Sequence, residues 1–181
     1  IRLETAYQLA LKKDPRAVGQ TEALMAKVPE EIWPIFPQIF AQSGSPEAKK
    51  ILRKMLIHPN EHVRIATIMS LAENGHDDFL PHIRRMASHH GAAQQEACAT
   101  ALGMLKDESS VTRLQELKRS PHHNVRLAAL HALYVLGRQD VVEEIAQIED
   151  TPDDLINDLF HLAYWPGHPL GRPVCGSRET V

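Results

Sequence analysis

The chain has 181 residues, of which 43% are hydrophobic, 24% charged and 5% aromatic, and its formal net charge is -3. This composition is typical of a globular protein with enough apolar material to form a core. It excludes a strongly basic domain, and no apolar run is long enough to cross a bilayer, so we expect no membrane segment. Cys98 and Cys175 are too few for a disulfide framework and are expected to be free thiols.

The first residue is Ile1, with no Met and no helix cap before an apolar helical run. This start indicates a fragment or a processed product. Any targeting signal or anchor could have been lost with the missing residues, so the sequence constrains the compartment only weakly. We expect the cytoplasm.

Residues of similar character recur every 31 positions along most of the chain, as in the series Phe40, Leu71, Leu102 and Leu133. A fixed period of about 20–50 residues indicates stacked supersecondary units. We therefore predict five helical pairs, a terminal helix and an irregular Pro/Gly-rich tail. The predicted boundaries are about 1–27, 28–58, 59–89, 90–120 and 121–151 for the pairs, 152–165 for the helix and 166–181 for the tail.

The first two units are predicted to contain four helices, over Leu3–Lys12, Pro15–Ala26, Glu30–Gln42 and Pro46–Ile57. Pro34 and Pro37 fall inside the third of these. Each proline removes an amide donor and clashes with the preceding turn. We therefore expect a bent or broken helix at this place.

In the third unit, helix A is predicted over Glu61–Glu73, with apolar residues on a face too wide for a surface helix. Asn74-Gly75 supplies a left-handed cap, and helix B follows with a narrower apolar stripe. The next two units repeat this order. Their helices A are predicted over Gln94–Leu105 and Val125–Leu136, and their helices B around Val111, Leu114 and Leu117 and around Val142, Ile145 and Ile148.

Two units begin with a Pro-led turn that is followed by Val-Arg and then by Ala and Leu, starting at Pro59 and at Pro121. This pattern resembles the short bacterial HEAT-like repeat, which also occurs in phycocyanobilin lyase proteins. The resemblance covers residues 58–150 well, 1–57 more loosely and the tail not at all. The chain departs from the family pattern at His58 and Ser120, where the family favours Asp, and at Gln94-Gln95, which replaces Val-Arg.

The resemblance implies an all-α fold, a right-handed α-α superhelix with helices A on the outer face and helices B on the inner face. It says almost nothing about activity, because the residues that define the repeat are structural. Arg64, Gln95 and Arg126 share one repeat position. We interpret them as a structural ladder that binds loop carbonyls and carboxylates between units, in preference to an anion site.

Charged residues on the predicted helices B are basic over three units and acidic in the fifth. The basic set is Lys49, Lys50, Arg53, Lys54, Arg84, Arg85, Arg113, Lys118 and Arg119, and the acidic set is Glu143, Glu144, Glu149 and Asp150. Solvated helix faces are the simplest interpretation. The change of sign also fits a concave groove that binds another protein with an acidic surface. The candidate contact residues are Arg53, Lys54, Arg84, Arg85 and Arg113, with Glu143 and Glu144 setting the partner's direction.

Other functions have weaker support in the sequence. The predicted groove positions hold no Trp, Tyr or Phe on which bases could stack, so we expect no nucleic-acid binding. Pro59 separates His58 from His62, and no zinc-ligand spacing occurs, so no metal site is predicted. No phosphate loop, nucleophile elbow or His-Glu-x-x-His motif is present.

We therefore expect a non-enzymatic interaction scaffold with no catalytic residues and no cofactor. Three alternatives remain open: a HEAT-like enzyme of the bilin lyase or DNA-repair type, a nucleic-acid binder with a basic groove, and a structural spacer within a longer protein.

Overall fold

The computed structural model describes residues 2–88 and 91–148. Within these ranges the regular elements are ten α-helices and four 3₁₀-helices, with no strand, so the predicted all-α class is confirmed. The chain divides into two compact units, residues 1–141 and 142–181. The predicted terminal helix over 152–165 and the tail over 166–181 lie outside the described residues.

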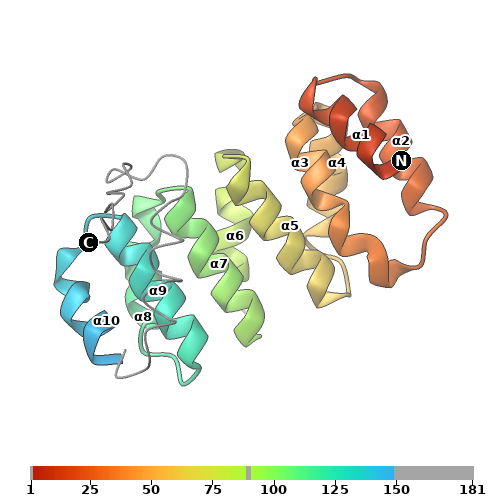
Figure 1. Cartoon of the computed structure of the whole chain (residues 1–181). Coiled ribbons are helices and arrows are strands. Elements are labelled where there is room, and N and C mark those ends of the chain that lie inside the picture. The colour runs from red at the N-terminus through yellow and green to blue at the C-terminus, as the bar shows by residue number, and fades with distance from the viewer. Residues whose placement is uncertain (1, 89–90, 149–181) are drawn as a thin grey trace, which may run out of the picture. The chain divides into compact units, whose positions relative to one another are not determined.

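The described residues of the compact unit 1–141, hereafter the first unit, form nine α-helices, whose arrangement Figure 1 shows. They are α1 Arg2–Leu11, α2 Arg16–Met25, α3 Pro37–Ser43, α4 Pro46–Met55, α5 Glu61–Glu73, α6 Leu80–Met86, α7 Ala92–Met104, α8 Val111–Leu117 and α9 His123–Val135. The 3₁₀-helices are η1 Glu30–Ile35, η2 Asp77–Phe79, η3 Glu108–Ser110 and η4 Gln139–Val141. In the second unit, the described helix is α10 Val142–Ile148.

A residue in the left-handed backbone conformation follows each of five helices at the same repeat position. These residues are Lys13, Gly44, Gly75, Lys106 and Gly137, with φ values of 56°, 64°, 68°, 52° and 79°. They are spaced 31 residues apart. Glycine adopts this conformation without strain and ends many helices in this way. The repeat therefore fixes the backbone of the turn even where lysine replaces glycine.

Proline breaks the first helix of the second pair, as the sequence predicts. Pro34 lies inside η1, and Pro37 occupies the first turn of α3, where a missing amide donor costs nothing. Phe36, at the junction, is buried. The break therefore leaves a short 3₁₀ segment followed by a regular helix that still reaches the core.

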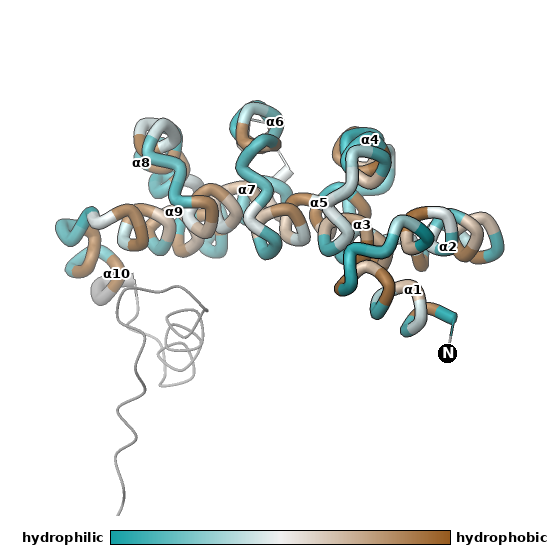
Figure 2. Tube along the Cα trace, turned by 90° about the horizontal axis from the view of Figure 1, so that it is seen from above, coloured by the Kyte–Doolittle hydropathy of each residue, from teal (hydrophilic) through white to brown (hydrophobic). Residues whose placement is uncertain are grey.

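Helices α3, α5, α7 and α9 form a row in which each contacts the next, and α1 contacts α3 (Figure 1). On one side of this row lie α4, α6 and α8 (Figure 2). We call the surface formed by these three helices the helix B face. α5 buries six residues and α6 only two, which agrees with the broad and narrow apolar stripes of their sequences. Among the described residues, no helix has the length and apolarity needed to cross a membrane.

The row is packed most tightly where α7 meets α9. A Cβ atom added to Gly103 would lie 2.8 Å from the Cα and 2.9 Å from the Cβ of Ala132. Both residues are on buried faces of their helices. The absence of a side chain at Gly103 therefore allows the two backbones to approach each other.

This contact predicts opposite effects of the same substitution at two helical glycines. Gly103→Ala should destabilise the chain by about 1–3 kcal/mol, because the added methyl group overlaps the α9 backbone. Gly19→Ala, in α2 with open space around the added Cβ, should stabilise by about 0.5–1 kcal/mol through helix propensity. Urea denaturation followed by circular dichroism measures both changes. Equal effects at the two positions would contradict the close approach of α7 and α9.

Candidate protein-binding surface

Three of the five predicted contact cations are exposed on the helix B face. Arg53 and Lys54 lie in the last turn of α4, and Arg85 lies in the last turn of α6. Within the described part of the chain, none of them forms an ion pair with a carboxylate. The Arg53 guanidinium carbon lies 5.2 Å from the ring centroid of the buried Phe79, a cation–π contact that orients it. These three side chains are therefore available to a partner.

Arg84 connects neighbouring units. Its Nε donates to Asp107 Oδ2 at 2.7 Å and its Nη2 donates to Oδ1 at 2.5 Å, in the planar two-point geometry that arginine favours with carboxylates. Asp107 is only 4% exposed and also accepts a hydrogen bond from the Ser110 hydroxyl. Reversing the charge of Arg84 would thus place a second carboxylate beside a buried one, so Arg84 has a structural role.

The environment of Asp107 lowers the pKa of its carboxyl group below the ordinary value of 3.8. Burial alone would raise this pKa, but the hydrogen bonds from Arg84 and Ser110 and the positive charge of Arg84 favour the ionised form and outweigh it. The same contact raises the pKa of the Arg84 guanidinium. Asp107 is therefore ionised in the folded chain at neutral pH.

Arg113 is also used within the chain. Its Nη2 donates to the carbonyl of Ala87 at 2.7 Å, and its Nη1 donates to Glu116 Oε2 at 2.6 Å. Its Nε is buried and has no hydrogen-bond partner among the described residues. Lys49 pairs with Asp78 of the next unit at 3.1 Å. Several cations of the predicted groove thus bind the repeats to each other.

The predicted ladder residues occupy equivalent places. Nη1 of Arg64 donates to the carbonyls of His58 and Pro59, and Nη1 of Arg126 donates to those of Ser120 and Pro121. In both units the arginine binds the loop carbonyls six and five residues before it. Gln95, between them in the repeat series, is half-buried.

Gln94, which the sequence interpretation missed, links Arg64 to the next unit. Its buried amide oxygen accepts from Arg64 Nε at 2.8 Å, and its Nε2 donates to the Met86 carbonyl at 3.2 Å. The only sequence signal was that glutamine replaces valine at a core position of helix A.

Glu143 and Glu144 lie in the first turn of α10, which belongs to the second unit. Glu143 is exposed and Glu144 is half-buried. A negative charge in the first turn of a helix is favoured by the free backbone amides there. Their predicted role in setting the direction of a partner stays a prediction.

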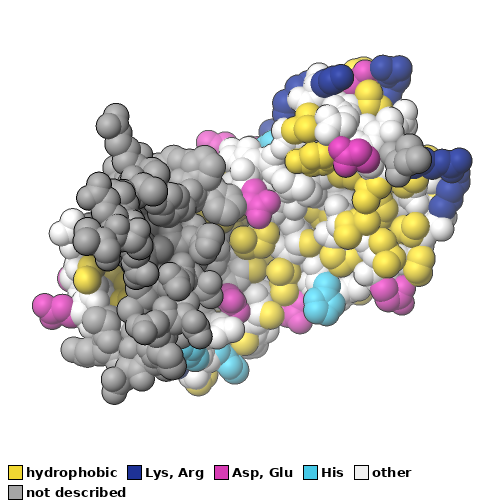
Figure 3. Space-filling view, in the orientation of Figure 1, with side chains coloured by type: hydrophobic (Ala, Val, Ile, Leu, Met, Phe, Trp, Pro, Cys, Tyr) yellow, Lys and Arg dark blue, Asp and Glu magenta, His cyan; other side chains and the backbone are white. Residues whose placement is uncertain are grey.

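Exposed apolar side chains gather at the N-terminal end of the first unit (Figure 3). Leu3 and Leu11 of α1 and Ile32 and Ile35 of η1 are each at least 40% exposed. This area offers no charge pattern that would define a partner. The helix B face is the better-defined candidate.

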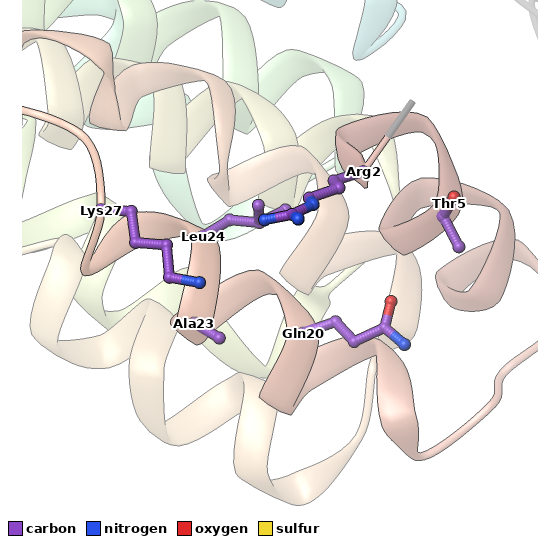
Figure 4. Close-up of a pocket in the computed structure, with 6 residues that line it drawn as sticks. All are labelled: Arg2, Thr5, Gln20, Ala23, Leu24 and Lys27. Atoms are coloured by element: carbon purple, nitrogen blue, oxygen red, sulfur yellow. The ribbon is translucent and has the colours of Figure 1, made fainter.

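The surface of the described residues has two small depressions. The one between α1 and α2 has a volume of about 260 Å³ (Figure 4). It is lined by Arg2, Thr5, Gln20, Ala23, Leu24 and Lys27. The other, of about 370 Å³, lies beside the first turns of α7 and α9. The first depression is smaller than the ~300 Å³ at which ligand pockets usually begin, and no carboxylate lines it. The second is lined by Glu96 but by no aromatic ring other than histidine.

Other chemical groups of the described region do not assemble into a reactive centre. Burial raises the pKa of the Cys98 thiol to about 12, so it is a poor nucleophile at neutral pH. Residues 2–88 and 91–148 hold no group of three or more His, Cys, Asp or Glu side chains that could bind a metal ion. The ring centroid of Trp33 lies 5.3 Å from that of His58.

Comparison with known families gives a match for the middle of the chain. Residues 94–120 match the PBS lyase HEAT-like repeat. This segment carries a HEAT-like repeat. The matched segment contains most of α7 and all of α8, in the unit whose Gln94-Gln95 departs from the Val-Arg pattern. The left-handed turns and the row of helices A show that the other helical pairs of the compact unit 1–141 have the same organisation. This compact unit is a HEAT-like solenoid.

A separate similarity joins part of the chain to bacterial proteins named as uncharacterized zinc proteases. The chain is 48% identical over 46 residues to one from Mycobacterium leprae, 46% over 41 residues to one from Bacillus subtilis, and 37% over 43 residues to one from Rickettsia bellii. These matches cover 25%, 23% and 24% of the chain. In each case the chain spans about 10% of the relative's length.

These relatives contradict the expectation that the chain is non-enzymatic. That expectation rested on the absence of complete catalytic motifs. A segment corresponding to a tenth of a protease need not hold a complete set of metal ligands, so a motif search does not detect the relation.

The Arg84–Asp107 contact predicts a specific dependence of stability on acid. Because the pKa of Asp107 is lower in the folded chain than in the unfolded chain, its contribution is fully present above about pH 5 and is lost as the pH falls through and below 3.8. Asp107→Asn should cost about 1–3 kcal/mol at neutral pH. This difference from the wild type should shrink towards pH 3.

Urea denaturation at a series of pH values measures this difference. Asp78→Asn is the matched control, since its partly exposed pair with Lys49 should contribute at most about 1 kcal/mol. A cost of Asp107→Asn that stays constant from pH 7 to pH 3 would contradict the assigned ion pair.

Proposed function

We propose that the HEAT-like repeats form a protein-binding module, that the helix B face is its contact surface, and that the partner presents acidic side chains. The observation that carries this proposal is the division of the cations on this face. Arg84, Arg113 and Lys49 bind groups of the chain, whereas Arg53, Lys54 and Arg85 are exposed without a carboxylate partner within the described residues. Structural need accounts for the first group and leaves the second group unexplained.

The local charge supports an acidic partner. The sequence of α4 contains four Lys and Arg residues and one Glu, and that of α6 contains two Arg residues and no acid. A surface of one sign attracts oppositely charged segments and speeds their association, even when the net charge of the chain is slightly negative. A structural spacer would not need unpaired cations on two adjacent helices.

This proposal predicts the effect of charge reversal at two exposed positions. Peptides selected from a displayed random library on the full chain should be acidic. The Lys54→Glu/Arg85→Glu variant should bind them at least about tenfold more weakly, because two attractive pairs become repulsive. Fluorescence anisotropy measures the affinity and circular dichroism the melting temperature, which should not change.

The control is Lys12→Glu/Lys27→Glu, which alters net charge equally at two exposed residues of the first hairpin. Equal loss of affinity in the two double variants would mean that net charge alone governs binding. That result would contradict the helix B face as the contact surface.

A second candidate function rests on the relatives alone. The stretch that resembles zinc proteases would contribute to a zinc-dependent peptidase. The names of the relatives describe whole proteins, and the chain spans about 10% of each. Residues 2–88 and 91–148 hold no group of three or more side chains that could bind a metal ion. Because the chain spans about 10% of these relatives, the test concerns its contribution and not complete activity. The full chain should bind zinc in equilibrium dialysis, and absence of binding at every zinc concentration contradicts this candidate.

A further inference from the structure

Arg53 and Arg84 occupy the same position in consecutive repeats, 31 residues apart. Arg84 binds the carboxylate of Asp107 in the next repeat through two hydrogen bonds. The residue that corresponds to Asp107 in the repeat after Arg53 is His76, which carries no carboxylate. The chain therefore supplies an acid to one of these two arginines and a histidine to the other.

Two polar side chains of the repeat that follows Arg53 are already bound elsewhere. The Nε2 atom of His76 lies 2.7 Å from the carbonyl oxygen of Ala41, within hydrogen-bond distance. Asp78 accepts a hydrogen bond from Lys49 at 3.1 Å. In the described part of the chain, Arg53 is thus left without a carboxylate partner.

An aromatic ring holds the guanidinium of Arg53 at this place. Its central carbon lies 5.2 Å from the ring centroid of Phe79, which is buried and takes the repeat position of Ser110. A guanidinium can lie over an aromatic ring and still offer the N–H donors of its edge to a carboxylate. Since Arg53 is exposed and already oriented, little side-chain entropy is lost when it binds.

We infer that Arg53 binds an Asp or Glu side chain of the partner through two parallel hydrogen bonds, as Arg84 binds Asp107 within the chain. This inference rests on the proposed function and names the residue that selects a carboxylate. Lys54 and Arg85 attract the same partner by charge. Within the described residues neither of them has a cation–π contact that would orient it.

Two conservative substitutions separate geometry from charge. Arg53→Lys keeps the positive charge but removes the planar two-point donor. It should weaken the binding of a fluorescein-labelled peptide of alternating Glu and Gly by at least about threefold. Fluorescence anisotropy measures this affinity at about 0.15 M salt, where distant charges are largely screened.

Arg85→Lys is the matched control for this substitution. Arg85 is also exposed, and within the described residues it forms neither a cation–π contact nor an ion pair. The effect of Arg85→Lys on the same peptide should therefore stay below about twofold. A peptide of alternating Gln and Gly measures the binding that does not depend on carboxylates.

An internal carboxylate placed beside Arg53 should compete with the peptide. His76→Asp introduces an acid at the position that corresponds to Asp107, whereas His76→Asn has nearly the same shape and no charge. The Asp variant should bind the Glu peptide at least about threefold more weakly than the Asn variant. It should also melt about 2–4 °C higher, because Arg53 then has an internal partner.

The outcomes separate the inference from the proposed function. Equal effects of Arg53→Lys and Arg85→Lys would overturn the inference, and the binding surface would stand if Lys54→Glu/Arg85→Glu still lost affinity. Equal peptide binding by His76→Asp and His76→Asn would overturn it as well. Equal binding of the Glu and Gln peptides by the unaltered chain would contradict both the inference and the proposed function.

A phosphate is the other anion that a planar guanidinium binds at two points. A peptide with phosphoserine in place of Glu tests this ligand. Binding at least about tenfold tighter than that of the Glu peptide, with the gain lost in Arg53→Lys, would overturn the assignment to a carboxylate. Similar or weaker binding of the phosphoserine peptide is the expected result.

Discussion

The turn that follows each helix A is the constraint on which the rest of the first unit depends. At one position in five successive turns, the backbone takes the left-handed conformation, at Lys13, Gly44, Gly75, Lys106 and Gly137. This conformation ends one helix and directs the chain into the next segment at a fixed angle. Because this turn recurs every 31 residues, the helices A occur at a regular spacing along the chain and can pack as a row. The lysines at two of the five places accept an unfavourable backbone conformation that the neighbouring units impose.

Apolar packing joins the helices A, and polar contacts join the turns. The close approach at Gly103 and Ala132 is one case of the first kind, and the contact of Arg84 with Asp107 is one case of the second. Several of the polar contacts take their cations from the helix B face, as those of Lys49, Arg84 and Arg113 do. As a result, the charges left over on that face cannot be identified by counting Lys and Arg in the sequence, and the bonds of each side chain have to be known.

The sequence predicted most of the fold because the signals for α5 and its neighbours are local. The bounds predicted for α5 agree with those observed, since Asn74-Gly75 marks its end. The 3₁₀ turns η2 and η3 were not predicted, because a single turn carries too few residues to distinguish its period from that of an α-helix. The handedness of the superhelix stays a prediction.

The site was less predictable, since its decisive contacts join residues far apart in the sequence. Arg84 is 23 residues from Asp107, and Glu108 was an equally plausible partner by charge alone. The relation to zinc proteases was missed for a different reason, because it is a local similarity over 46 residues, about 10% of the relative, and not a compact catalytic motif.

The row of helices A also bears on how the chain folds. Each helix of the row touches the next one in the row, one repeat of 31 residues further along the chain, and the largest contacts are those of α7 with α5 and α9. Contacts limited to adjacent repeats need less loop closure than contacts between distant parts of the chain, so folding is expected to spread from whichever hairpin forms first. The helix break at Pro34 and Pro37 is then expected to slow the propagation of folding between the first hairpin and the later helices of the row. Each of these two parts can still form on its own.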